Sequence, residues 1–184
     1  MEIAYRLKKI KLLLLDVDGV LTTGEIVYTD AGEQIKSFDV KDGVGIRMLR
    51  AAGIEVGIIT GRKSEALRHR CRNLNIELLF DGVRDKVAVM EALAARTGTD
   101  PEAMGFVGDD LPDLAVMRRA GLAVAVADAH PLIRETAHMT TRACGGRGAV
   151  RETCEAILKA QDKWEGILAK LFGGGNGAEG SRST

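Results

Sequence analysis

The feature that most constrains the fold is a run of four leucines, residues 12–15, that ends in Asp16-Val17-Asp18-Gly19. The run is apolar without alternation, which is typical of a strand buried on both faces in the middle of a parallel sheet. Asp16 and Asp18 are two residues apart, so they leave the strand on the same side, and Gly19 lets the backbone turn. Holding two carboxylates together is costly unless a cation joins them. From these residues alone, an aspartate-rich turn without chemistry is the alternative.

Downstream of the leucine run, apolar stretches alternate regularly with stretches of helical periodicity. We expect strands at residues 54–60, 76–80, 104–108 and 122–126, and helices at residues 64–73, 85–96 and 112–120. Strands that alternate with helices need crossover connections, which produce a parallel sheet with helices on both faces. The sequence therefore predicts the α/β class, a Rossmann-like three-layer sandwich in which ligands bind beyond the carboxyl ends of the strands.

Residues 24–38 show a different pattern, with two β-prone runs, 25–29 and 34–38, around the turn-forming residues 30–33. This pattern predicts a β-hairpin. Its apolar side chains are Ile26, Tyr28, Ile35 and Phe38. They are too few for a separate core, so we expect the hairpin to pack against something else, such as another subunit.

The chain of 184 residues is long enough for one domain with a full core and too short for two. We expect a single domain over residues 1–172 that ends in one long helix, from about residue 148 to residue 172. The last stretch, residues 173–184, is rich in glycine and serine and has almost nothing to bury. We therefore expect this tail to be disordered.

The charge and cysteine content argue against several classes of function. The chain has 26 basic and 26 acidic side chains, so no overall field would attract nucleic acid or an anionic membrane. Cys71, Cys144 and Cys154 are odd in number and form no CxxC pair, which argues against a disulfide framework and a zinc site. No apolar segment is long enough for a signal peptide or a membrane span. We therefore expect a cytoplasmic protein.

Polar residues suited to phosphate chemistry follow the predicted strands. They are Asp16, Asp18, Thr60, Gly61, Arg62, Lys86, Asp109 and Asp113. Because the carboxyl ends of parallel strands meet at one edge of a sheet, these residues should lie together. Carboxylate oxygens suit Mg²⁺, whereas a lysine and a hydroxyl suit a phosphoryl group. The sequence therefore predicts a site for both, with helix capping as the alternative role for Asp109 and Asp113.

These residues resemble the four motifs of the haloacid dehalogenase superfamily of phosphatases. The motifs DVDGVLT, IITGR, Lys86 and GDDLPD occur in the expected order over residues 12–126. The resemblance implies that Asp16 attacks phosphorus and becomes an aspartyl phosphate. It also implies that Asp18 is the general acid, which protonates the leaving alkoxide, and then the general base, which activates water.

The same resemblance implies a magnesium cofactor and a phosphate site. The metal site would consist of Asp16, the backbone carbonyl of Asp18, Asp109 and Asp113, the last acting through Lys86 or a metal-bound water. The phosphate would be held by Thr60, Gly61 and Lys86. The magnesium ion and Lys86 both have a physical purpose, because a carboxylate approaches an anionic phosphate only where the charge between them is cancelled.

A narrower resemblance, to the family of 3-deoxy-D-manno-octulosonate 8-phosphate (Kdo 8-phosphate) phosphatases, extends from Lys11 to about Gln161. It rests on the hairpin in place of a cap domain and on the stretches FDVKDGVGIR, VAVADAHP and GGRGAVRE. It implies a magnesium-dependent cytoplasmic homotetramer of lipopolysaccharide biosynthesis. The substrate contacts that it implies are Asp18, Asp39, Val40, Lys41, Asp42, Gly43, Arg47, Arg62 and Arg70. A sugar that bears both a carboxylate and a phosphate offers anionic groups for several arginines to bind. The alternative for an arginine on a helix, such as Arg47 or Arg70, is a solvated position on the surface.

The glycine-rich segment 145–152 suggests one more substrate contact. A site without a cap is open to water on one side, yet hydrolysis needs an oriented and partly enclosed substrate. Glycines beside Arg147 would let a loop approach the site, and Arg147 would meet the sugar carboxylate or phosphate, in its own or a neighbouring subunit. The alternative is a simple helix entry, with Gly148 near the cap and Arg151 solvated.

Two other functions compete with this interpretation. A phosphatase of a related nine-carbon sugar-acid phosphate would carry the same motifs, so the sequence does not settle the sugar. A receiver-like signalling domain or inactive scaffold also combines an aspartate, magnesium, a threonine and a lysine. A receiver lacks a general acid two residues after its phospho-acceptor, where this chain has Asp18. We therefore expect a phosphoric monoester hydrolase that acts on a small phosphorylated sugar acid.

Overall fold

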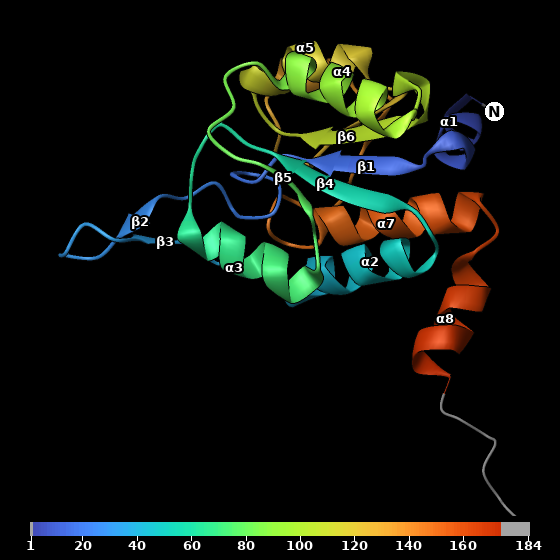
Figure 1. Ribbon diagram of the computed structural model, residues 1–184, viewed down its shortest axis with the longest axis horizontal. Helices are drawn as coiled ribbons and strands as arrows, with labels where there is room; N and C mark the ends of the chain where they lie inside the picture. Colours follow the sequence, from blue (N-terminus) through green and yellow to red (C-terminus); the bar gives the residue numbers. More distant parts are fainter. Residues whose placement is uncertain (1, 174–184) are drawn as a thin grey trace, which may run out of the picture.

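A parallel sheet forms the centre of the protein in the computed structural model, which describes residues 2–173 (Figure 1). Its six strands lie in the order β5-β4-β1-β6-β7-β8. Their bounds are β1 Leu12–Leu15, β4 Glu55–Ile59, β5 Leu78–Phe80, β6 Met104–Gly108, β7 Leu122–Ala125 and β8 Met139–Thr140. Each neighbouring pair is parallel. The prediction of a parallel sheet is confirmed.

The leucine run is the inner strand β1, which lies between β4 and β6. Leu12 is opposite Glu55 on one side and Met104 on the other. All four leucines of β1 are buried, as expected for a strand covered on both faces. The residues that follow β1 therefore begin in the middle of the carboxyl edge of the sheet.

Helices cover both faces of the sheet. Helices α2, α3 and α7 lie on one face, and α4 and α5 lie on the other (Figure 1), with α6 packed against α5. The bounds are α1 Glu2–Lys9, α2 Val40–Ala51, α3 Glu65–Leu74, α4 Lys86–Thr97, α5 Leu114–Arg119, α6 Pro131–Thr136, α7 Ala149–Ala160 and α8 Trp164–Phe172, with short 3-10 helices η1 Pro101–Ala103 and η2 Leu111–Asp113. The three-layer α/β sandwich is confirmed. In the part of the chain that is described, every helix is too short or too polar to cross a membrane.

The predicted hairpin consists of β2 Val27–Tyr28 and β3 Gln34–Ile35, which pair antiparallel. The paired part is shorter than the β-prone runs. The hairpin projects from the body of the protein at the end opposite α1 (Figure 1). Tyr28 is 61% exposed and Ile35 is 50% exposed. Residues 2–173 therefore leave apolar surface of the hairpin uncovered, as expected from the sequence.

The prediction of one continuous helix over residues 148–172 is wrong. Helix α7 ends at Ala160 and α8 begins at Trp164. Between them Asp162 has a φ of 57°, a left-handed conformation that does not continue a right-handed helix. Of the predicted disordered tail, Gly173 closes α8 with its N–H on the carbonyl of Leu168. Residues 174–184 lie outside the described residues.

Candidate active site

A cavity of about 390 Å³ opens at the carboxyl ends of β1, β4 and β6. It is lined by Asp16, Asp18, Thr60, Gly61, Arg62, Lys86, Asp109 and Asp113, and also by Gly24, Ile26, Val83, Arg84, Asp110 and Pro112. Its volume is in the usual range for a small-molecule site. The topology of the sheet therefore brings together every strand-end residue that the sequence predicted.

Lys86 lies between two carboxylates on the floor of this cavity. Its Nζ donates to Asp16 Oδ1 at 2.8 Å and to Asp113 Oδ1 at 2.6 Å. Lys86 is the first residue of α4, and the side chain of Asp85 caps that helix by accepting the backbone N–H of Val87. The lysine is only 8% exposed, which is tolerated because its charge is paired on two sides.

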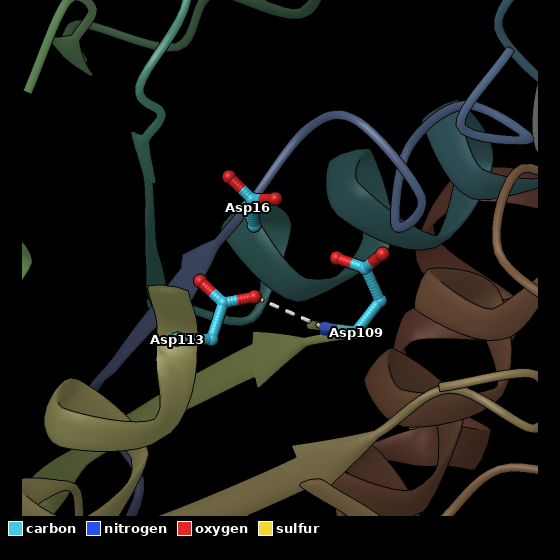
Figure 2. Close-up of side chains that lie close together, drawn as sticks. All are labelled: Asp16, Asp109 and Asp113. Atoms are coloured by element: carbon cyan, nitrogen blue, oxygen red, sulfur yellow. Dashed lines mark hydrogen bonds between the residues drawn. The ribbon is translucent and has the colours of Figure 1, made fainter. Parts of the chain in front are cut away.

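The carboxylates of Asp16, Asp109 and Asp113 lie around a common space (Figure 2). The backbone N–H of Asp109 donates to Asp113 Oδ2 at 3.0 Å, which fixes these two residues relative to each other (Figure 2). Gly19 has a φ of 89°, and a Cβ there would collide with the Asp109 carboxylate. The glycine of the DVDG motif is therefore needed both for the turn and for the room that it leaves beside Asp109.

The electrostatics of this cluster show an excess of negative charge. Burial raises the pKa of Asp16 to about 6, with a further contribution from the charge of Asp113. Burial, followed by the charges of Asp16 and Asp113, raises the pKa of Asp109 to about 8. Burial lowers the pKa of Lys86, but the two carboxylates beside it outweigh that effect and raise it. One lysine does not neutralise three carboxylates, so the site favours a further cation.

The donor set of the cluster fits a magnesium ion. One ligand oxygen from each of Asp16, Asp109 and Asp113 lies within 4.8 Å of the others, and carboxylate oxygens are the ligands that hard divalent cations prefer. Both oxygens of Asp113 already accept hydrogen bonds, from Lys86 and from the N–H of Asp109. Asp113 therefore positions Lys86 and the backbone of Asp109, whereas one oxygen of Asp16 and the carboxylate of Asp109 accept no hydrogen bond from the described residues.

The loop after β4 supplies donors for a phosphoryl group. Thr60 is buried at the end of this strand, and its Oγ1 lies 3.5 Å from the N–H of Arg62. Gly61 is exposed to the cavity. The Nε of Arg62 lies 3.9 Å from Asp18 Oδ2. A hydroxyl, a backbone N–H and a guanidinium group from this loop therefore line the same cavity as Asp18.

Lys36 and Arg84 are cationic residues at the site that the sequence analysis missed. Lys36 follows β3, and its Nζ donates to Asp18 Oδ1 from a side chain that is almost fully buried. Arg84 lines the cavity two residues before Lys86. Arg84 could have been found from the sequence, because it is a basic residue in the loop just before the motif lysine Lys86. No signal in the sequence identified Lys36, because its contact depends on how the base of the hairpin packs against the residues that follow β1.

Several residues predicted to contact the substrate lie outside this cavity. Arg70 donates to the backbone carbonyl of Asp39 at 3.0 Å, and its guanidinium lies 5.8 Å from the centre of the Phe38 ring. Arg47 is exposed on α2. Lys41 is exposed, and its backbone N–H donates to Asp39 Oδ1, which caps α2. Within one chain, Arg62 is thus the predicted arginine that reaches the cavity.

Arg147 lies in a second hollow beside the base of the hairpin. The hollow is lined by Thr23, Glu25, Ser37, Phe38, Asp39, Val40, Gly146 and Arg147. The alternative interpretation of this segment, a helix entry, is correct for Gly148, which is the N-cap of α7. It is wrong for Arg151, which forms an ion pair with Glu155 at 2.6 Å instead of being solvated. The substrate contact of Arg147 stays a prediction.

Asp42 and Gly43 do not lie at the surface of either hollow. Both are buried in the first turn of α2, and Asp42 accepts the backbone N–H of Arg151 at 2.8 Å. A Cβ at Gly43 would collide with the guanidinium of Arg70. The neighbours of both residues in this structure are other parts of the protein, and their contact with a substrate stays a prediction.

Comparison with known proteins agrees with this geometry. A model of the haloacid dehalogenase-like hydrolases matches residues 39–121. The Kdo 8-phosphate phosphatase of Yersinia pestis is 48% identical over 165 residues, which are 90% of this chain and 88% of the relative. The enzyme of Escherichia coli K12 is 47% identical over 162 residues, covering 88% of this chain and 86% of the relative.

Solved structures give the same result. The Yersinia pestis crystal structure has a TM-score of 0.88 over 90% of this chain and 89% of that chain, at 48% identity. The Kdo 8-phosphate phosphatase of Moraxella catarrhalis, in complex with magnesium, phosphate and Kdo, has a TM-score of 0.90 at 39% identity over 92% of this chain and 97% of that chain. The chain belongs to the haloacid dehalogenase-like hydrolases, in the family of the Kdo 8-phosphate phosphatases, and is a phosphoric monoester hydrolase.

Proposed function

We propose that this protein hydrolyses 3-deoxy-D-manno-octulosonate 8-phosphate to Kdo and inorganic phosphate through an aspartyl phosphate on Asp16. The observation that carries the proposal is the arrangement in one cavity of Asp16 beside Lys86, with Asp18 two residues further along the chain. A nucleophile, a charge-neutralising cation and a separate acid are the minimum set for two-step phosphate ester hydrolysis. The names of the relatives supply the sugar.

In the first step a carboxylate oxygen of Asp16 attacks phosphorus. The bond between phosphorus and the ester oxygen breaks, and Asp18 gives its proton to the leaving sugar alkoxide. Lys86 and the donors of the loop after β4 hold the phosphoryl oxygens, with the hydroxyl of Thr60 among them. Kdo leaves, and the phosphoryl group stays on Asp16.

In the second step Asp18, now a carboxylate, takes a proton from water as the water oxygen attacks the same phosphorus. The bond to the Asp16 carboxylate breaks, and phosphate is released. Lys36 and Arg62, which contact the two oxygens of Asp18, hold this side chain in one orientation for both proton transfers. The acid of the first step is thus the base of the second.

We propose magnesium as the cofactor, held by Asp16, Asp109 and the backbone carbonyl of Asp18. When bound, it supplies the positive charge that allows a carboxylate nucleophile to approach a phosphate. The acidic cluster and the raised pKa values of Asp16 and Asp109 support this assignment, as does the magnesium in the Moraxella catarrhalis complex.

The proposal extends to assembly and location. The exposed apolar residues of the hairpin support a homotetramer in which the hairpin is the contact between subunits. In such an assembly the residues around Arg147 would meet a substrate held by a neighbour. The free cysteines Cys71 and Cys154, both buried, are consistent with a reducing cytoplasm, where we place the reaction as a step of lipopolysaccharide biosynthesis.

The test of the substrate is phosphate release from a panel of sugar phosphates in the presence of Mg²⁺. We expect kcat/KM for Kdo 8-phosphate to exceed that for other compounds of the panel. The panel must include a nine-carbon sugar-acid 9-phosphate, because that class shares the carboxylate and the primary phosphate. A preference for the nine-carbon compound would replace Kdo 8-phosphate as substrate and leave the chemistry of Asp16 intact.

A further inference from the structure

Asp42 is a buried carboxylate that the proposed chemistry does not use. It lies in the first turn of α2 and is 1% exposed. Its Oδ1 accepts the N–H of Arg151, in the first turn of α7, at 2.8 Å, whereas Oδ2 has no hydrogen-bond partner among the described residues. The first N–H groups of an α-helix have no partner within the helix. Asp42 therefore caps a helix other than its own.

Helix α7 has no side chain of its own for this purpose. Its N-cap residue is Gly148, with a φ of 103° and no side-chain hydrogen bond. Burial raises the pKa of Asp42 to about 6, although the backbone N–H groups around the start of α7 act in the opposite direction. The raised pKa shows that burial of this carboxyl has a desolvation cost. The geometry shows that Asp42 supplies the side-chain acceptor that α7 lacks, and this contact fixes the start of α7 against α2.

The segment before α7 packs directly on the loop that carries the acid. The N–H of Gly146 donates to the carbonyl of Val20 at 2.8 Å. A Cβ on Gly145 would overlap the carbonyl oxygen of Gly19. Gly19 and Val20 follow Asp18 directly. Residues 145–148, which we call the glycine bridge, therefore connect the start of α7 to the backbone of the acid.

We infer that Asp42 is a positioning residue, which caps α7 and thereby sets the place of the glycine bridge and of Asp18. The inference rests on the acid and base role of Asp18 in the proposed function, but not on the identity of the sugar. Asp18 must reach the leaving oxygen, and a displacement of about 1 Å is enough to lower turnover strongly. Ground-state binding of a phosphate by Thr60 and Lys86 does not depend on this chain of contacts.

The test compares two substitutions of Asp42 in the magnesium-loaded enzyme, with p-nitrophenyl phosphate and Kdo 8-phosphate as substrates, well below the Tm of each variant. Asp42→Ala removes the acceptor and should lower kcat by about 10- to 100-fold for both substrates, with KM nearly unchanged. Asp42→Asn keeps an oxygen for the N–H of Arg151 and should stay within about threefold of the wild-type kcat.

Two further variants separate position from stability. Thr153 is buried on α7, and its Oγ1 donates to the carbonyl of Ala149 at 3.0 Å. Thr153→Val should lower Tm and leave kcat unchanged. Asp128 is exposed and holds the glycine bridge from its other side, because Oδ1 accepts the N–H of Gly145 at 2.9 Å. Asp128→Ala should lower kcat as Asp42→Ala does, without disturbing the core.

A wild-type kcat in either Asp42→Ala or Asp128→Ala would overturn the inference, as would equal losses of kcat in Asp42→Ala and Thr153→Val. If Asp42→Ala does not fold, Asp128→Ala decides. A rise in KM for Kdo 8-phosphate alone would show instead that Asp42 contacts the sugar. Asp18→Asn, measured in parallel, tests the proposed function separately, since full activity there would remove the acid role whatever Asp42 does.

Discussion

Removal of the metal should make the stability of this protein fall as the pH rises. The reason is the raised pKa of two carboxyl groups, about 6 for Asp16 and about 8 for Asp109, against 3.8 for an ordinary aspartate. Below about pH 4 both groups are protonated in the folded and unfolded states and contribute nothing. Between about pH 4 and pH 8 both carboxyl groups lose their protons readily in the unfolded chain but keep them to a higher pH in the folded chain. The free energy of unfolding therefore decreases over this range. Above about pH 8 both groups are ionised in both states, and the free energy of unfolding decreases no further through them.

The magnitude follows from Asp109. A shift of about 4 pKa units corresponds to at most roughly 6 kcal/mol, and solvent screening at this partly exposed group reduces that to about 3 kcal/mol. Asp16 acts in the same direction, because burial and the charge of Asp113 raise its pKa as well. For a chain of this size, about 3 kcal/mol corresponds to a change in Tm of roughly 6–12 °C.

The assay is thermal unfolding of protein treated with a chelator and dialysed, at about pH 5.5 and about pH 8.5, with and without Mg²⁺. We expect the Tm of metal-free protein to be lower at the higher pH. Mg²⁺ should raise Tm more at that pH, because the carboxyl groups are already ionised and the ion displaces no proton when it binds. Asp109→Asn should reduce both effects. Asp30→Asn is the matched control, since Asp30 is exposed in the turn of the hairpin and outside the cluster. Equal pH dependence in wild type and Asp109→Asn would refute this reasoning.

Four other outcomes follow from the structure. Asp16→Asn should reduce turnover to background without lowering Tm, because a near-isosteric amide cannot attack phosphorus; phosphate release near the wild-type rate would contradict this assignment. Lys86→Met should lower the unfolding free energy of metal-free protein by about 3–5 kcal/mol, measured by urea titration, because it leaves buried carboxylates unpaired. Replacing Tyr28 and Ile35 by lysine should dissociate the proposed homotetramer in light scattering, and a wild type already monomeric at micromolar concentration would disprove the proposed contact. Arg147→Ala should lower kcat/KM for Kdo 8-phosphate about 10-fold or more while sparing p-nitrophenyl phosphate, so equal losses would exclude a role in selection.

The central sheet was predictable because its signals are local and repeated. Each inner strand is an apolar run, and each crossover helix has its own periodicity. Helix α1 and strand β8 are two of the elements that local signals did not reveal. Helix α1 buries only Leu7 and is held by tertiary contacts such as that of Arg6 with the carbonyl of Gly121 at 2.7 Å. Strand β8 has two residues, Met139–Thr140, and exists only through its pairing with β7. The break between α7 and α8 depends on one left-handed residue, Asp162, which periodicity does not reveal.

The active site was predictable to the extent that it follows from strand topology. Asp16, Thr60 and Asp109 each come directly after a strand of one parallel sheet, so their meeting at its edge required no knowledge of side-chain packing. Lys36 lies on a hairpin whose direction is set by tertiary contacts. Asp42 belongs to a motif that resembles a substrate-binding stretch, yet the first turn of α2 faces α7. Spacing along a helix does not show which neighbour it meets.

The two aspartates of the DVDG motif have different surroundings, which supports the different roles that we propose for them. Asp16 has a side chain 11% exposed that shares Lys86 with Asp113, so burial and like charge act on it together. Asp18 is 23% exposed and faces the cations of Lys36 and Arg62. A nucleophile benefits from a dry position beside a fixed cation, whereas a proton carrier must exchange with water between steps. The strand end places one carboxylate inside the charged cluster and the next at its edge.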